Sequence, residues 1–216
     1  VSMRAISTYF GMVLVVAAAS GCLRKEVAHT VYLGPSGVVW AVTESGVRSD
    51  EHEPSDRRRA EYEYAVAATA GVHPIAEAFH RLGAQSVTAT WLRRERPYAV
   101  MTEARFADVR QLALALLDDV GAQGEVGVTR EACRTRLEAR INADEGPDTT
   151  PDSPVDGLLA DLYAYRFVLT DGRFVAADGF EIREDGAVAV PDREKAAADG
   201  VLLLSLTWAD DGCAVR

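Results

Sequence analysis

The feature that most constrains the fold is a strict alternation of side chains from Cys133 to Ile141. Every second position in this run holds a small or apolar residue, and charged residues fill the positions between them. Because successive side chains of a strand point to opposite faces, the pattern predicts a strand with one buried face and one wet face. Such strands are typical of an antiparallel sheet that carries its helices on a single side.

A first helix is expected to begin at Asp56 after an N-cap at Ser55, and Gly83 is expected to end it. Pro74 lacks the backbone N–H that a helix interior needs, so we expect a kink or a split near Gly71. The predicted buried stripe has three- and four-residue spacing and consists of Tyr62, Ala65, Val66, Thr69, Val72, Ala76 and Phe79.

A second helix is predicted after Asp108, which can cap it, and Gly121 is expected to end it. Hairpins are predicted before both helices, over residues 29–42 and 86–106. Asp-Gly pairs favour tight turns, and they recur every seven residues in a predicted meander of short strands over 163–190. The predicted fold class is therefore α+β, with an antiparallel sheet, two main helices packed on one face and a C-terminal β-meander.

The first 21 residues have the features of an export signal. Arg4 precedes an apolar run over residues 10–19, which is followed by the small residues Ser20 and Gly21. About 18 apolar residues are needed to cross a bilayer, so this run is too short to do so. A charged start, a short apolar stretch and small residues before a cut predict that residues 1–21 are removed.

The residues Ala19-Ser20-Gly21-Cys22 resemble the lipobox of bacterial lipoproteins. The resemblance implies that the thiol of Cys22 is acylated and that the acyl chains anchor the protein to a bacterial membrane. Leu23 after the cysteine is similar to the outer-membrane sorting class of lipoproteins, which implies a location facing the periplasm. An uncleaved anchor and a plain secretory signal are the alternatives.

This interpretation divides the chain into a signal peptide over 1–21, an acylated tether over 22–28 and a single α+β domain over 29–216. Within the domain, the residues 142–156 are rich in Asp, Pro, Thr and Gly and predict an acidic surface loop. Cys133 and Cys213 form an even remainder in an exported chain, which predicts a disulfide, with two buried free thiols as the alternative.

The net charge of −10 predicts repulsion from nucleic acid and from anionic lipid surfaces, so no nucleic-acid partner is expected. The strand predicted after Cys133 carries Arg134, Arg136 and Arg140 on its wet face, with Glu103 and Arg105 expected on a neighbouring strand. Such a basic stripe could bind an acidic envelope protein or an anionic envelope polymer. A solvated face with ion pairs is the alternative.

The candidate metal ligands are His73, Glu77 and His80, whose spacing on a helix predicts one exposed face. We find no nucleophile elbow and no glycine-rich phosphate loop, and no cofactor is predicted. The leading hypothesis is a non-enzymatic binding or envelope-assembly module. A metal-dependent or hydrolytic enzyme that uses the three candidate ligands is one alternative, and a small-molecule or lipid carrier with an apolar cavity is another.

Overall fold

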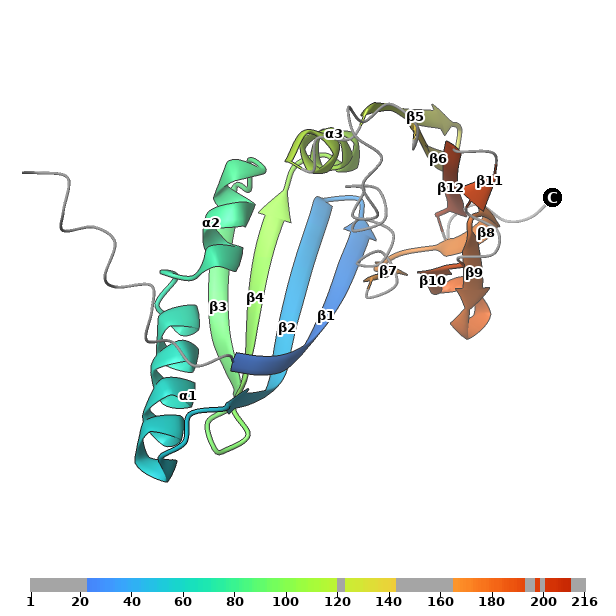
Figure 1. The fold of residues 1–216 in the computed structure, drawn as a ribbon. Helices are drawn as coiled ribbons and strands as arrows, with labels where there is room; N and C mark the ends of the chain where they lie inside the picture. The colour runs from blue at the N-terminus through green and yellow to red at the C-terminus, as the bar shows by residue number, and fades with distance from the viewer. Residues whose placement is uncertain (1–22, 120–122, 143–164, 193–196, 199–200, 211–216) are drawn as a thin grey trace, which may run out of the picture.

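A computed structural model describes residues 23–119, 123–142, 165–192, 197–198 and 201–210 (Figure 1). These residues form two sheets and three α-helices, so the α+β class predicted from the sequence is confirmed. The seven-stranded sheet has the order β3-β4-β2-β1-β7-β10-β9. Its strands are β1 (Leu23–Gly34), β2 (Gly37–Ser49), β3 (Ser86–Arg93), β4 (Ala99–Phe106), β7 (Tyr165–Leu169), β9 (Phe180–Arg183) and β10 (Val188–Pro191).

The second, smaller sheet has five strands, four of them in one path and the fifth paired beside it. Its path has the order β11-β12-β6-β5, and β8 pairs with β12 beside it. The bounds are β5 (Gln123–Glu131), β6 (Arg134–Asn142), β8 (Arg173–Asp178), β11 (Ala197–Ala198) and β12 (Val201–Ala209). β6 is the alternating strand predicted from the sequence, and its neighbours on both sides are antiparallel.

The C-terminal strands turn where the Asp-Gly pairs predict, but they are not a simple meander. Gly172 and Gly179 adopt positive φ angles of 83° and 74°, as the tight turns require. However, β8 leaves the run to join the smaller sheet, and β7 pairs in parallel with β1, with Thr30 opposite Arg166. The larger sheet is therefore mixed, and the last third of the chain holds both sheets together.

The first predicted helix is two helices, α1 (Pro54–Thr69) and α2 (Pro74–Arg81), which cover one face of the larger sheet (Figure 1). Pro74 is the first residue of α2, so the predicted split is confirmed. The predicted N-cap is wrong, because Glu53 occupies that position and Ser55 lies within the helix. The cap of α3 (Val109–Asp119) is confirmed, since Asp108 Oδ1 accepts the N–H groups of Arg110 and Gln111 at 2.7 and 3.1 Å.

The stripe predicted for α1 is wrong over its first half. Tyr62 is 53% exposed and Val66 39% exposed, whereas Glu61, Ala65 and Ala68 are the buried side chains of α1. The small alanines pack with Val100 of β4, and this packing places the carboxylate of Glu61 against the sheet. The stripe continues as predicted in α2, where Ala76 and Phe79 are buried.

One hydrophobic core joins the two sheets. The ring of Phe79 lies 5.0 Å from that of Trp40 and 6.1 Å from that of Phe106, measured between ring centroids. Leu206 of β12 is 1% exposed and belongs to the same core cluster as Val31 and Leu33 of β1. The smaller sheet is thus packed on the larger one through continuous apolar contact.

The tether predicted over residues 22–28 is not seen, because β1 already begins at Leu23, which lies opposite Ser49 of β2. The pairing of the two strands shifts register between Arg24 and Glu26, where two residues of β2, Gly46 and Val47, oppose Lys25 alone and form a β-bulge in β2. The predicted acidic loop lies outside the described residues, apart from Asn142 at the end of β6.

Candidate functional site

An apolar cavity of about 130 Å³ lies between α3 and the two sheets. The larger sheet contributes aromatic side chains to its wall, and α3 contributes aliphatic ones. Its lining consists of Val31, Trp40, Val109, Leu112, Ala113, Leu116, Leu117, Val126, Leu137, Ala139, Ile141, Tyr165, Phe167, Phe180, Leu204 and Leu206. No charged residue is among them, so the cavity suits an apolar group. The sequence analysis named such a cavity as the mark of a carrier.

A buried polar cluster lies at the start of β1, where Lys25 reaches Glu44 of β2 and Tyr64 of α1. Glu44 of β2 is 1% exposed and accepts hydrogen bonds from the ammonium group of Lys25 and, at 2.6 Å, from the hydroxyl of Tyr64. Lys25 also lies over the ring of Tyr64, with 4.7 Å between its Nζ and the ring centroid. This cluster attaches the start of β1 to α1.

His73 completes the polar cluster from the N-terminus of α2. Its Nδ1 accepts the N–H of Ile75 at 3.3 Å, and its Nε2 lies 3.9 Å from Oε2 of Glu44. That carboxylate oxygen is buried and accepts no hydrogen bond from the described residues. Burial lowers the pKa of His73 below its usual value, although the charges of Glu44 and Glu77 oppose this shift. The same carboxylate and burial raise the pKa of Tyr64.

A second buried carboxylate, Glu61 of α1, binds the turn between β3 and β4. Its two oxygens accept bonds from the Arg96 guanidinium at 2.5 and 3.0 Å, and one oxygen also accepts the N–H of Ser49 at 3.1 Å. Burial alone would raise the pKa of Glu61, but the bonds from Arg96 and Ser49 outweigh it and lower this pKa. The pair therefore joins α1, β2 and the β3–β4 turn.

The predicted metal ligands do not share one exposed face. His73 is the N-cap of α2 and is 4% exposed, whereas Glu77 and His80 are exposed on the helix. The expected exposure is therefore wrong for His73, because its ring turns inward to Ile75 and Glu44. The part of the chain that the structure describes contains no group of three or more His, Cys, Asp and Glu side chains that could hold a metal ion.

The predicted arginine stripe lies on β6, where Arg134, Arg136 and Arg140 are all exposed. Arg136 forms an ion pair with Glu138 at 2.6 Å. A hollow of about 420 Å³ on this face is lined by Arg136 and Arg140 together with Glu125, Glu138, Asp178 and Ser205. Its charge is mixed, and the expected neighbours Glu103 and Arg105 lie instead on β4 of the larger sheet. Cys22 and Cys213 lie outside the described residues.

The sequence analysis missed Lys25, Glu44, Tyr64, Glu61 and Arg96. For Glu61 a signal existed, since it shares one helix face with Ala65 and Ala68 at spacings of four and three residues. For Lys25 the signal was weak: it lies an even number of positions from Val31 and Leu33 and so shares their face of β1, but a lysine is usually exposed. No single-residue pattern marks Glu44 as the centre of a cluster.

No family model matches the chain, and no curated protein matches it. Among solved structures, the NMR structure of the folded domain of the Mycobacterium tuberculosis LppM protein is 15% identical in sequence. The match covers 96% of each chain with a TM-score of 0.37. None of the described helices is both long enough and apolar enough to cross a membrane.

Proposed function

We propose that the protein is a non-enzymatic, lipid-anchored binding module that holds a small apolar group between its two sheets. The observation that carries this proposal is the 130 Å³ cavity with its purely aliphatic and aromatic lining. An apolar group gains roughly 25 cal/mol for each Å² of surface removed from water, and such a lining offers it no competing polar partner.

The size of the cavity limits the ligand. In another protein, a cavity of about 150 Å³ lined by aliphatic and aromatic side chains binds benzene. Sites for drug-sized ligands measure about 300–1,000 Å³, well above the volume found here. The ligand is therefore a group of about the size of one aromatic ring or of a short acyl segment, and a longer lipid would place only its end in the cavity.

The anchor is the second part of the proposal. The leader ending at Cys22 supports acylation of that residue, and its sorting signal supports a place in the outer membrane facing the periplasm. We also propose the Cys133–Cys213 disulfide, because the N–H of Asp210 donates to the carbonyl of Cys133 at 3.2 Å and so brings the chain near this turn. Arg134, Arg136 and Arg140 are the proposed contact for an envelope protein or polymer.

Ligand binding is tested by titrating residues 23–216 with toluene in a calorimeter. The change Ala113→Phe places a ring in the cavity from α3 and should abolish the binding of toluene. The matched control is Gln111→Phe, which adds the same ring to an exposed position of the same helix. Toluene that binds the Ala113→Phe variant as well as the unchanged chain would overturn the cavity proposal. Intact mass of the native protein tests acylation of Cys22 separately.

A further inference from the structure

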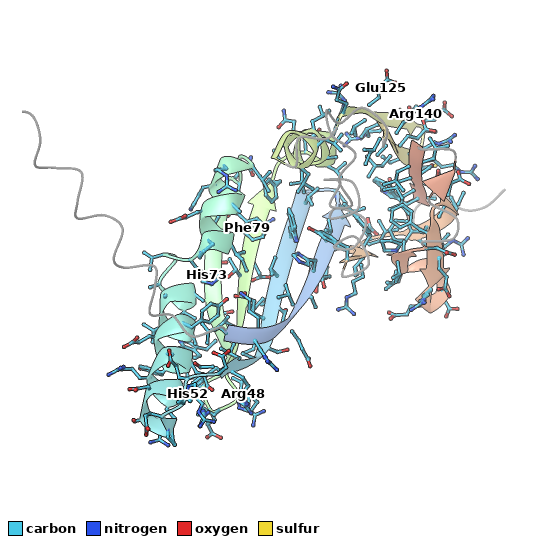
Figure 2. All side chains as sticks on the ribbon, viewed as in Figure 1. Arg48, His52, His73, Phe79, Glu125 and Arg140 are labelled. Atoms are coloured by element: carbon cyan, nitrogen blue, oxygen red, sulfur yellow. The ribbon has the colours of Figure 1, made fainter. Side chains whose placement is uncertain are left out.

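The chain leaves the lipid-anchored cysteine directly into one end of the larger sheet. Leu23 pairs with Ser49, and the N–H of Val47 donates to the carbonyl of Tyr98 at 3.4 Å, beside the β3–β4 turn. The start of α1 follows Ser49 after a short connection. We call residues 23–26, 48–59 and 93–96 the anchor pole. Figure 2 shows Arg48 and His52 at this end, far from Glu125 and Arg140 on the smaller sheet.

The anchor pole differs in charge from the rest of the protein. It contains nine Arg or Lys residues and six Asp or Glu residues, and two of the cations, Lys25 and Arg96, are paired with Glu44 and Glu61 outside these ranges, so its net charge is +1. The whole chain carries a net charge of −10. The end of the domain nearest Cys22 is thus slightly basic, whereas the protein as a whole is acidic. An anionic surface would attract this end and repel the acidic remainder, which favours one orientation.

Two arginines of the anchor pole lie directly opposite each other on neighbouring strands. Arg24 of β1 lies opposite Arg48 of β2, and both side chains are exposed. Like charges in directly opposed positions destabilise a sheet. Within the described residues neither arginine forms an ion pair, and Glu61, the carboxylate that Arg48 influences, is already bound by Arg96. Arg48 donates only to the carbonyl of its neighbour Val47, at 3.3 Å.

We propose that Arg24 and Arg48 bind phosphate groups of anionic lipids in the bilayer that holds the acyl chains of Cys22. The planar guanidinium group presents paired donors that match phosphate oxygens, and an anion between the two arginines removes their repulsion. The anchor pole then lies on the membrane surface. This inference rests on the lipid anchor of the proposed function, and it does not depend on the apolar cavity.

Aromatic side chains beside the anchor pole support the same orientation. Tyr62, which is 53% exposed, stacks on Trp91 with ring centroids 6.4 Å apart, and both rings contact Tyr98. Leu92 of the same strand is 52% exposed. Tyrosine and tryptophan are enriched where proteins meet lipid headgroups, because one part of the ring is apolar and the other polar.

The test uses the full lipidated chain in nanodiscs of phosphatidylglycerol or of phosphatidylcholine, with hydrogen exchange as the measurement. We expect the amides of residues 50–53 and 94–96 to exchange more slowly on the anionic lipid. The double change Arg24→Gln/Arg48→Gln should reduce this extra protection about thirtyfold, since each cationic side chain near an anionic surface contributes about a fivefold factor. The matched control is Arg134→Gln/Arg140→Gln on β6, which should retain it.

The outcomes separate the two proposals. Equal protection on both lipids, or an equal loss of protection in the β6 control, would overturn lipid binding by Arg24 and Arg48. Neither result would affect the proposed acylation of Cys22. The peptide that contains Cys22, recovered from the same digest, shows whether acyl chains are present. If they are absent, the proposed lipid anchor and the proposed lipid binding by Arg24 and Arg48 are both wrong. Unchanged exchange of residues 38–42 in the core of β2 verifies that the variants are folded.

Discussion

The end of the larger sheet where β1 begins buries two carboxylates, Glu44 and Glu61, whereas the space between the two sheets is lined by apolar side chains around a cavity. Each buried carboxylate has a specific cationic partner, Lys25 or Arg96. Removing one partner of a buried ion pair leaves an unpaired charge in the interior, whereas an apolar wall tolerates changes in side-chain shape. The first region thus fixes the arrangement of strands and helices, and the second can admit a ligand.

The largest expected effect tests whether the fold depends on the pairing of Lys25 with the buried carboxylate of Glu44. Lys25→Met keeps the length of the side chain but leaves the Glu44 charge buried without its cation, which should destabilise the fold by about 3 kcal/mol. Urea denaturation measures the change. The control Arg24→Met, one residue away and exposed, should shift stability by no more than about 0.5 kcal/mol. Equal losses of stability in Lys25→Met and Arg24→Met would show that the buried pair stabilises the fold no more than an exposed charge does.

A smaller effect should appear in the dependence of stability on pH. The pKa of His73 is lowered in the fold, so the unfolded chain binds more protons once the pH falls below about 6.5. The contribution of His73 is therefore fully present above that pH and is lost as the pH falls through the lowered pKa. Glu44, Lys25, Glu77 and the ring of Tyr64 surround the imidazole and set the position of this transition.

The variant His73→Asn removes this titration and keeps a side chain able to cap α2. Chemical denaturation at pH 5, 6 and 7.5 should show a weaker decline of stability toward acid in the variant than in the unchanged protein. The exposed histidine of the same helix offers a control, since His80→Asn should leave the decline as it was. If the stability of His73→Asn falls toward acid pH as steeply as that of the unchanged protein, groups other than His73 cause the decline.

The smallest expected effect concerns the apolar region between the two sheets. Ala113→Phe, proposed above to block ligand binding, should change the free energy of unfolding by no more than about 1 kcal/mol, because the new ring enters existing space instead of a filled core. The same denaturation curve provides the value. A loss of several kcal/mol would mean that the region between the sheets is as rigid as the polar end.

Local patterns predicted the parts of the fold that local chemistry decides. The alternation in β6, the cap at Asp108 and the break at Pro74 each depend on neighbouring residues, and all three are confirmed. The turn glycines at 172 and 179 belong to the same group. In these places the sequence within one element is sufficient to determine the structure.

Long-range pairing is what the patterns could not reveal. The parallel contact of β1 with β7 joins Thr30 to Arg166, which are far apart in the chain, and no local signal specifies it. The same holds for Lys25 and Glu44, which the pairing of β1 with β2 brings together. It also holds for α1, where Tyr62 was predicted to be buried but Glu61 takes the buried position through its bonds to Arg96. The apolar cavity likewise depends on how two sheets meet, so sequence reasoning could name it only as a condition for a carrier.

The length of β1 has a consequence for how the proposed ligand would move between the proposed membrane anchor and the cavity. Val31 in the cavity wall lies eight positions after Leu23, the residue next to the proposed lipid anchor at Cys22, which is a span of about 26 Å at the usual rise of a strand. Under the proposed anchor and ligand, a regular strand in place of a flexible tether would hold the ligand away from the lipid headgroups. Such a geometry suits delivery to or collection from another molecule in the surrounding space better than direct extraction from the lipid beneath.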